Sequence, residues 1–473
     1  MSYAPLPTTA EPAGSRQGAT FTNRWRSHLD TFSPRSATTR TKSFLDQLPP
    51  RTVRLFAWVG GVVVILIVMV SFNHAKRTSF TGSPLDSPRS SRLGEYSWLA
   101  KWKGSSYGVA RAGADGQHWN QGLIDPVYTE DEHTGYLMPP DVYPAALNPY
   151  KRANAAFVAL VRNNEREAMR DSMRSIEMRG NRKWGYPWVF MNDEPFDQAF
   201  IDGVKSITRS EVIFHVIPKE HWSYPEWINQ TYAAEERQKM VNENVIYGGS
   251  ESYRHMCRFN SGFFFQQKVL DQFKWYWRIE PGVEFFCDID FDPFLFMQAN
   301  KKTYGFTISL YEYRRTVETL WEETREFARL HPEYIHPDNA VDFLVDGGKG
   351  LFEGDWNNCH FWSNFEIADL DFWRSKPYMD YFNFLDRKGG FFYSRFGDAP
   401  IHSIAVALFL PKDKIIHLDP ISYRHNPYTH CPQNNELFHD NGKCECETKN
   451  DFNTHDGYSC QPRWWDLVGH WNY

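Results

Sequence analysis

An eighteen-residue segment without a charged side chain, residues 55–72 (LFAWVGGVVVILIVMVSF), constrains this chain more than any other feature. As a helix rising 1.5 Å per residue, it spans roughly 27 Å, which is enough for a thin bilayer. A buried core helix is the alternative, but such helices rarely run this long without a polar face. A cleaved signal peptide fits poorly because more than fifty residues precede the segment. We therefore predict a single transmembrane helix.

The residues on either side of this segment indicate its orientation. Lys and Arg slightly favour the N-terminal side, which predicts a cytoplasmic N-terminus. All seven cysteines and the one N-glycosylation sequon, at Asn229, follow the segment and suit an oxidising lumen. We predict a type II membrane protein with a disordered cytoplasmic tail over 1–54, an anchor over 55–72 and a stem over 73–147. The odd cysteine count leaves at least one thiol unpaired or intermolecular.

From residue 148 onward the hydrophobic pattern changes to alternating strands and helices, which predicts an α/β fold with parallel strands over 148–473. The predicted strands are 155–161, 187–191 and 212–217, and the predicted helices are 165–178, 196–207 and 314–330. The formal net charge of −6 predicts neither nucleic-acid binding nor a polybasic membrane surface.

Arg162 lies directly after the first predicted strand. In open α/β sheets, ligands bind beyond the carboxyl ends of the strands. The planar guanidinium of arginine suits phosphate, so Arg162 is a candidate contact for an anionic nucleotide. A surface arginine without a ligand is the alternative.

Glu280 is the first candidate metal ligand. It follows a strand-like apolar segment and is placed in a turn by Pro281 and Gly282. A hard divalent cation takes oxygen from such a carboxylate and keeps other positions open for diphosphate oxygens.

Three further carboxylates, Asp288, Asp290 and Asp292, alternate shortly after Glu280. Residues i and i+2 of an extended chain share a face, so the spacing alone favours these three as a metal-binding acidic motif. The alternative for Asp292 is the N-cap of a helix that begins at Pro293.

Glu366 is isolated among aromatic residues in the segment 356–369. A carboxylate in such surroundings is either a paired structural group or a reactive one. Sugar chemistry passes through an oxocarbenium-like state, which a nearby carboxylate stabilises or attacks. Asp369, three residues later on a predicted helix, is a possible neighbour or structural partner.

Two histidines, His402 and His425, lie in segments with Pro, Asp and Asn neighbours. A lone histidine is more often a hydrogen-bonded structural residue than a ligand. Two histidines near one inferred site favour a metal-binding role for one of them.

Several of these segments together resemble the fungal α-1,2-mannosyltransferases of glycosyltransferase family 15. The motifs that carry the resemblance are 253–259 (YRHMCRF), 280–283 (EPGV), 287–289 (CDI), 363–369 (SNFEIAD) and 398–403 (DAPIHS). Asp398 opens the last of these motifs. The resemblance runs from about residue 148 to at least residue 460, with the motifs in the same order as in the family.

The resemblance implies roles for individual residues. It implies that Glu280 and His425 bind manganese, which replaces the spacing-based preference for Asp288 and Asp290. It implies that Glu366 is the nucleophile. The residues that it places near the donor are Tyr253 and, more loosely, Arg162 and Arg258.

The resemblance also implies an activity and a place in the cell. We expect a GT-A-type nucleotide-sugar-binding fold that transfers mannose from GDP-mannose to a terminal mannose of a glycoprotein O- or N-glycan. We expect Mn²⁺ dependence and retention of the α configuration, through either double displacement on Glu366 or front-face return. The expected location is the Golgi membrane, with the catalytic domain in the lumen, and a complex of Golgi glycosyltransferases is a possible partner.

Two other classes of protein stay open. A glycoside hydrolase also uses paired carboxylates, but it needs neither a nucleotide nor the metal. A non-catalytic mannan-binding paralogue would bind a glycan without turnover. Dependence on both GDP-mannose and Mn²⁺ separates the transferase from these alternatives.

Overall fold

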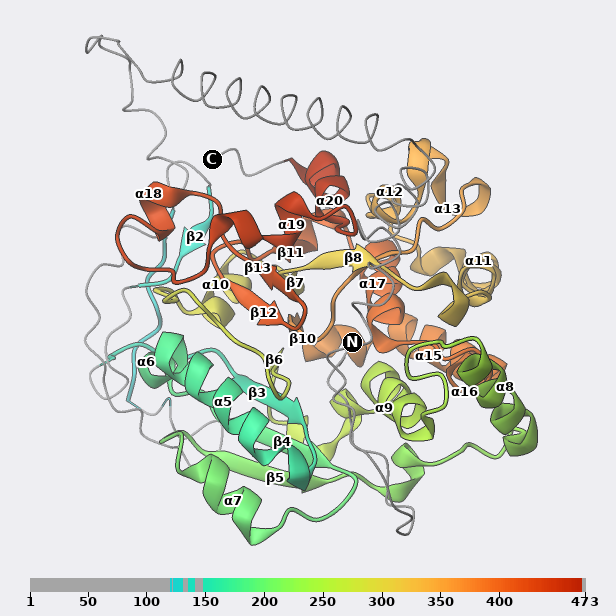
Figure 1. Ribbon diagram of the computed structural model, residues 1–473. Helices are drawn as coiled ribbons and strands as arrows, with labels where there is room; N and C mark the ends of the chain where they lie inside the picture. Colours follow the sequence, from blue (N-terminus) through green and yellow to red (C-terminus); the bar gives the residue numbers. More distant parts are fainter. Residues whose placement is uncertain (1–119, 121, 131–134, 141–147, 470–473) are drawn as a thin grey trace, which may run out of the picture. The chain divides into compact units, whose positions relative to one another are not determined.

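The computed structural model describes residues 120, 122–130, 135–140 and 148–469 (Figure 1). The predicted tail and anchor lie outside these residues. Within the described residues, no helix is both long and apolar enough to cross a membrane. Part of the predicted stem is described, and there Met138 is buried in the core and the Tyr136 ring contacts Phe296 at 5.3 Å. The predicted stem therefore includes residues, such as Tyr136 and Met138, that pack on the domain.

A mixed seven-stranded sheet forms the centre of the described chain, with strand order β11-β7-β10-β6-β3-β4-β5. Its strands are β3 (Ala155–Leu160), β4 (Trp188–Asn192), β5 (Val212–Val216), β6 (Trp275–Arg278), β7 (Tyr304–Phe306), β10 (Glu366–Asp369) and β11 (Ile415–His417). The strands β6, β3, β4 and β5 are parallel neighbours, which confirms the predicted parallel α/β region. Among these seven strands, β10 runs antiparallel to both of its neighbours, β6 and β7.

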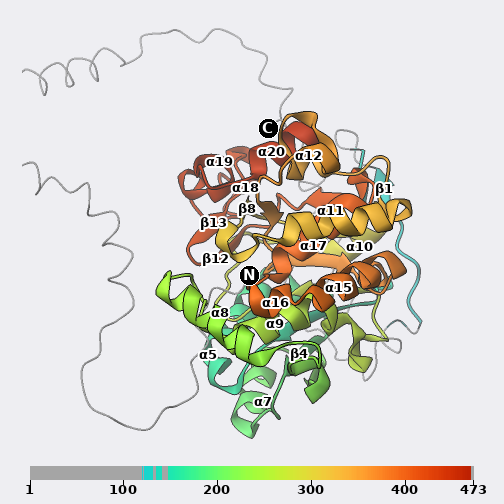
Figure 2. The same ribbon diagram turned by 90° about the vertical axis from the view of Figure 1, so that its right-hand side faces the viewer.

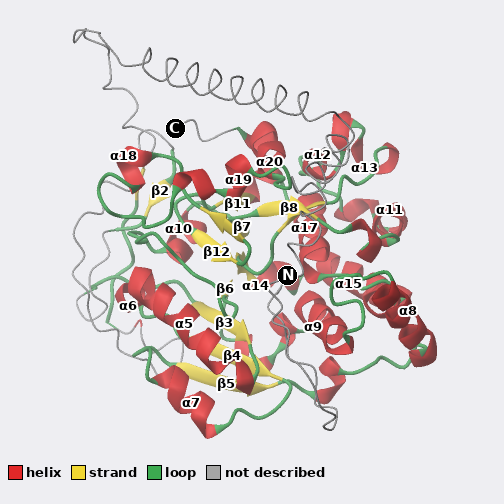
Figure 3. Cartoon of the chain, viewed as in Figure 1, coloured by secondary structure: helices red, strands yellow, loops and turns green. Residues whose placement is uncertain are grey.

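Alternating side chains of each central strand enter two hydrophobic cores, one on each face of the sheet. Phe157 and Ala159 of β3 belong to one core, and Ala156 and Val158 belong to the other. Helices cover both faces (Figure 3), which is why the central strands read as continuous apolar runs in the sequence.

The larger helices divide between the two cores. Helices α5 (Arg166–Ile176), α7 (Gln198–Lys205) and α10 (Pro293–Ala299) bury residues in the first core. The second core is packed by α9 (Glu251–Gly262), α11 (Leu320–Leu330), α15 (Lys376–Lys388) and α17 (Asp398–Phe409), which Figure 2 shows face on. The other long helices are α8 (Gln230–Asn242) and α20 (Gln461–Val468).

Two predicted helix starts are tested by the structure. Asp292 caps α10, because its side chain accepts hydrogen bonds from the backbone nitrogens of Phe294 and Leu295. This confirms the capping alternative. The helix predicted over 314–330 is shorter than expected, because the backbone leaves helical geometry at Val317 and α11 begins at Leu320.

Six of the seven cysteines, all within the described residues, form disulfides. The pairs are Cys287–Cys444, Cys359–Cys460 and Cys431–Cys446. The remaining cysteine, Cys257, is buried on α9, and burial raises the pKa of its thiol to about 12. The odd thiol is therefore a packed core group.

Gly262, at the end of α9, packs against Phe382 of α15. A Cβ atom added at Gly262 would lie 1.9 Å from the ring of Phe382, which is buried. We expect Gly262→Ala to lower the free energy of unfolding by about 1–3 kcal/mol, because the core has to shift to accept the methyl group. Urea unfolding measures this change.

The matched control is Gly457→Ala, where an added Cβ atom meets nothing within 4 Å. We expect this variant to change the free energy of unfolding by less than about 0.5 kcal/mol. Equal effects of the two substitutions would contradict the tight contact between α9 and α15.

Candidate active site

The direction of β10 brings two distant segments together at one edge of the sheet. Glu366 is the first residue of β10, and it pairs in register with Arg278, the last residue of β6. Because β10 is antiparallel, its first residue lies at the carboxyl end of the parallel strands, where α/β sheets bind ligands.

Arg278 is the residue around which this edge is organised. Its guanidinium lies 2.6 Å from Glu280 Oε1 and 2.6 Å from Asp398 Oδ2, and 4.0 Å from Glu366 Oε1. All four side chains are buried. Arg278 was not predicted as a site residue, although its spacing of two residues from Glu280 in an extended segment places both side chains on one face.

The charge of Arg278 sets the ionisation of its partners. Burial opposes the charged form of Glu280, but the Arg278 guanidinium outweighs it and lowers the pKa of Glu280 to about 2. The same balance of burial against Arg278 holds the pKa of Asp398 well below its ordinary value of 3.8. Both carboxylates are therefore charged at neutral pH.

Glu280 and His425 together fit a divalent cation. Oε1 of Glu280 is paired with Arg278, whereas Oε2 is buried with no hydrogen-bond partner among the described residues. That oxygen lies 3.5 Å from Nε2 of His425, the last residue of β12 (Tyr423–His425). The other ring nitrogen, Nδ1, lies 3.2 Å from the carbonyl oxygen of Asn426, which is the usual way of orienting a metal-binding imidazole.

Glu366 is fully buried and bonded on both oxygens. Tyr276 donates to Oε1 at 2.7 Å, and Tyr304 donates to Oε2 at 3.2 Å. Nδ1 of His402, on α17, lies 3.0 Å from Oε2. Burial and the Glu366 charge raise the pKa of both tyrosines well above 10, so that they remain donors.

The contacts of His402 show that it shares a proton with Glu366. Nε2 of His402 lies 3.1 Å from the carbonyl oxygen of Asn260, which only accepts hydrogen bonds, so that Nε2 carries a hydrogen. A hydrogen bond between Nδ1 and Glu366 then requires a second proton, on one of these two atoms. His402 therefore shares a proton with Glu366. It contacts Glu366 and Asn260, and it does not join Glu280 and His425 as a third metal ligand.

A hollow at the same edge of the sheet is lined in part by residues of this cluster. Its lining includes Arg162, Asn192, Arg278, Glu280 and Asn260. A neighbouring hollow shares Asn260 and Arg278 and reaches Glu366. The structure therefore brings the predicted residues Arg162, Glu280 and Glu366 to one connected region.

Helix α9 meets this hollow with Met256 and Asn260. Tyr253 lies one turn earlier on the same helix, where its ring stacks on Tyr247 at 4.6 Å and lies under the Arg395 guanidinium at 5.1 Å. Tyr253 is therefore buried and packed against these two side chains, and it is not one of the residues that line the hollow.

Arg258 of the same helix is not brought to the site. Its guanidinium makes two buried bonds to Asp386 of α15, at 2.7 and 2.8 Å. Side chains two positions apart on a helix lie on different faces, so Arg258 points away from Asn260. Its bonds to Asp386 join α9 to α15.

The metal-binding acidic motif predicted from spacing, Asp288, Asp290 and Asp292, is wrong. Asp288 pairs with Arg179 at 3.0 Å, Asp290 pairs with Lys443, and Asp292 accepts a hydrogen bond from Tyr186 as well as capping α10. The three carboxylates therefore have three separate structural partners.

Asp369 is also structural. The sequence suggested that Asp369 lies on a helix, but it is the last residue of β10. Its side chain caps the following α14 (Leu370–Trp373) and pairs with Lys274 at 2.9 Å. Asn229, the predicted glycosylation site, is exposed and caps α8 through a bond from the Tyr232 nitrogen at 3.1 Å.

The site combines the charged carboxylate of Glu280, the imidazole of His425 and the buried carboxylate of Glu366 at the carboxyl ends of parallel strands. This arrangement is typical of α/β enzymes that bind their ligands at that edge of the sheet. Residues 123–469 match the family of glycolipid 2-alpha-mannosyltransferases. The chain belongs to this family, glycosyltransferase family 15, and is an α-1,2-mannosyltransferase. It is 50% identical over 329 residues to a glycolipid 2-alpha-mannosyltransferase of Saccharomyces cerevisiae, covering 69% of this chain and 73% of that protein.

Two solved structures are similar to the described fold. One is core-mannan synthase A of Aspergillus fumigatus in its Mn/GDP form, with a TM-score of 0.63 and 36% identity over 73% of this chain and 98% of that chain. The other is the mannosyltransferase Ktr4p of S. cerevisiae in complex with GDP, with a TM-score of 0.64 and 33% identity over 82% of this chain and 94% of that chain.

The ion pair between Arg278 and Glu280 predicts a specific loss of stability in acid. The pKa of Glu280 is lowered in the folded chain from 4.5 to about 2, so its contribution is present above pH 4.5 and is lost as the pH falls toward 2. In EDTA, we expect Glu280→Gln to lose about 2 kcal/mol less stability than the wild type between about pH 7 and pH 3. Urea unfolding at both pH values measures the difference. Parallel losses in the two chains would contradict the pairing.

Proposed function

We propose that this α-1,2-mannosyltransferase uses GDP-mannose and Mn²⁺ and transfers mannose, with retention, to a terminal mannose of a glycoprotein O- or N-glycan. The observation that carries the proposal is the Arg278 cluster, which places Glu280, Glu366 and Asp398 at the ligand-binding edge of the sheet. The Mn/GDP form of the Aspergillus relative supports the choice of donor and metal. It also supports a GT-A-type nucleotide-sugar-binding fold.

Glu280 and His425 would hold the cation, as their geometry allows. When bound, Mn²⁺ offsets the negative charge that develops on the GDP leaving group. Arg162 lines the same hollow as Glu280 and adds a guanidinium suited to phosphate. The diphosphate would therefore be bound by Arg162 directly and by Glu280 and His425 through the cation.

Glu366 would act on the sugar. Its carboxylate would stabilise positive charge at the anomeric carbon as the bond to GDP breaks. Alternatively, it would attack that carbon and displace GDP, and the acceptor hydroxyl would then displace Glu366 from the mannosyl–Glu366 intermediate and give up its proton to a base. In front-face return, the departing phosphate takes the proton of the acceptor hydroxyl and Glu366 only stabilises charge. The bonds from Tyr276 and Tyr304 hold both oxygens of Glu366 in place in either route.

We also propose that the enzyme is a type II protein of the Golgi membrane. The uncharged segment 55–72 supports an anchor, and the three disulfides support an oxidising lumen for the domain. The exposed sequon at Asn229 is accessible to glycosylation. Digestion of intact microsomes with protease tests this, because a lumenal domain is protected until detergent is added.

The decisive assay uses the purified full-length chain with GDP-mannose, Mn²⁺ and α-methyl-mannoside, with and without EDTA. We expect an α-1,2-linked mannobioside, identified by NMR, that disappears with EDTA. A β-linked product would contradict retention. Product without dependence on the metal would contradict the role of Glu280 and His425. Sugar release from a mannan without any nucleotide would indicate a hydrolase.

Single substitutions separate metal binding from turnover. We expect Glu280→Gln to abolish Mn²⁺-dependent binding of GDP, because it removes the charged ligand. We expect Glu366→Gln to lower kcat by about 10²- to 10³-fold, the usual cost of removing one electrostatic contact to the transition state, with GDP binding largely intact. Calorimetry and initial rates measure the two effects.

The matched control is Asp369→Asn, which removes a carboxylate from the same strand as Glu366 but outside the cluster. We expect its kcat to stay within about twofold of the wild type, because surface changes away from a site have small effects. Near-normal turnover by Glu366→Gln would contradict the role proposed for Glu366.

A further inference from the structure

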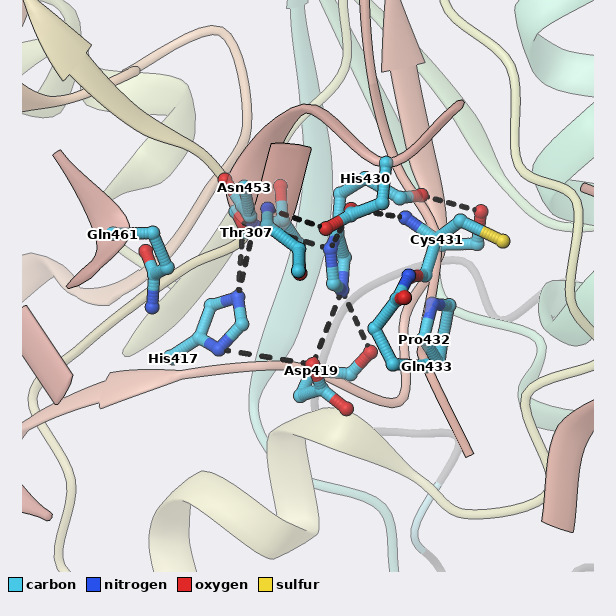
Figure 4. Close-up of polar contacts among 12 residues, drawn as sticks. Thr307, His417, Asp419, His430, Cys431, Pro432, Gln433, Asn453 and Gln461 are labelled. Atoms are coloured by element: carbon cyan, nitrogen blue, oxygen red, sulfur yellow. Dashed lines mark hydrogen bonds and ion pairs between the residues drawn. The ribbon is translucent and has the colours of Figure 1, made fainter. Parts of the chain in front are cut away.

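A second group of metal-ligand side chains lies outside the site described above. His417 ends β11, Asp419 follows two residues later, and His430 ends β13 (Tyr428–His430). Figure 4 shows the three side chains converging, with Thr307 and Asn453 beside them. All three are buried, with exposed fractions of 2%, 3% and 2%.

The ligand atoms of these three residues lie within 4.8 Å of one another. Asp419 Oδ1 lies 4.0 Å from Nδ1 of His417 and 3.6 Å from Nε2 of His430. Both separations are beyond the reach of a good hydrogen bond. Two metal bonds of about 2.1 Å at a tetrahedral angle separate their ligand atoms by about 3.4 Å. Asp419 Oδ1 already lies near that separation from His430, and the three side chains would have to move closer together to hold one ion.

The second nitrogen of each imidazole is oriented by an oxygen acceptor. Nε2 of His417 lies 3.0 Å from the carbonyl oxygen of Thr307, and Nδ1 of His430 lies 3.1 Å from Oδ1 of Asp451. In protein metal sites, the histidine ligands donate their other N–H to a carbonyl or carboxylate in this way. Nδ1 of His417 is the ring nitrogen that faces Asp419.

Charge in the cluster also favours a cation. Asp419 and Asp451 are two buried carboxylates, and both face His430. A buried carboxylate needs positive charge nearby, which either protons on the imidazoles or a bound cation supply. Nε2 of His430 lies 2.8 Å from the carbonyl oxygen of Asp419 and donates to it. A cation would replace that proton, as metals do when they bind histidine.

We propose that His417, Asp419 and His430 form a divalent-cation site of the zinc type, separate from the Glu280–His425 pair. Two imidazoles and one carboxylate are side chains that Zn²⁺ takes as ligands in proteins. The site would be structural. It would join the end of β11 to the hairpin of β12 and β13, which carries His425, and through Asp451 to α19 (Phe452–His455), which Asp451 caps.

The test uses the full-length chain with Glu280→Gln, which removes the proposed manganese pair from the measurement. The chain is stripped with EDTA, incubated with Zn²⁺ alone, desalted and analysed by mass spectrometry for metal. We expect about one zinc per chain. Co²⁺ in place of Zn²⁺ should give the absorption bands of a tetrahedral site, and Zn²⁺ should raise the thermal midpoint of unfolding.

Adding Asp419→Asn to this chain should abolish the bound zinc and the shift of the thermal midpoint. Asp451→Asn keeps all three ligands and should weaken zinc binding about 10- to 100-fold, the usual effect of removing a group that orients a ligand. The matched control is His360→Gln, which removes another fully buried imidazole from β9 (Cys359–Phe361). We expect it to keep one zinc per chain.

Two results would overturn the proposal. One is a folded Glu280→Gln chain, with cooperative unfolding, that retains no zinc and shows no shift of its midpoint. The cluster would then be a hydrogen-bonded network that holds protons only. The other is zinc bound with unchanged stoichiometry and affinity in the Asp419→Asn or Asp451→Asn chain. If Asp419→Asn does not fold, the comparison of Asp451→Asn with His360→Gln decides the question.

Discussion

One guanidinium, that of Arg278, holds together carboxylates from three parts of the chain. Glu280 follows it along the chain, Glu366 pairs with it across the sheet, and Asp398 begins α17. Buried charges are tolerated only when they are paired, and Arg278 supplies that pairing most closely for Glu280 and Asp398. Three carboxylates against one guanidinium leave an excess of negative charge. The proton shared by His402 and Glu366 offsets part of it, and the remainder suits the cation proposed at Glu280.

The sheet topology determines which residues can join this cluster. If β10 were parallel to β6, Glu366 would lie at the opposite edge of the sheet, away from Arg278. Its antiparallel direction places its first residue beside the last residue of β6. The aromatic residues of both strands then enclose the polar cluster, because Tyr276 and Tyr304 come from the strands on either side of β10. The isolation of Glu366 among aromatic residues in the sequence therefore reflects a real feature of the fold.

Local patterns in the sequence predicted local features. The strands β3, β4 and β5, helices α5 and α7, and the cap of α10 by Asp292 follow from hydrophobic periodicity and capping preference. Properties that depend on distant partners were not predictable in this way. Nothing near Asp288 shows that its partner is Arg179, 109 residues earlier. The burial of Arg258 against Asp386, 128 residues later, is equally invisible, because an arginine on a helix has the same local pattern in either role.

The turn at Pro281 and Gly282 made Glu280 a candidate, and the resemblance to a known family favoured it over the acidic motif of Asp288 and Asp290. The resemblance did not identify Arg278, since that residue belongs to a strand that reads as core. The structure adds what motifs lack, namely which charges face each other. The predicted anchor and cytoplasmic tail lie outside the described residues, so they stay predictions.

The three disulfides have a consequence for the order in which the enzyme is completed during biosynthesis. Arg278, Glu280 and Glu366 emerge from the ribosome before His425, which belongs to a segment that Cys444 ties back to Cys287. Glu280 and His425 can therefore meet only after residue 425 has been made, and the Cys287–Cys444 bond then ties the segment that follows His425 back to the segment that follows Glu280. The pair proposed to hold the cation is thus among the last parts of the site to be assembled during synthesis.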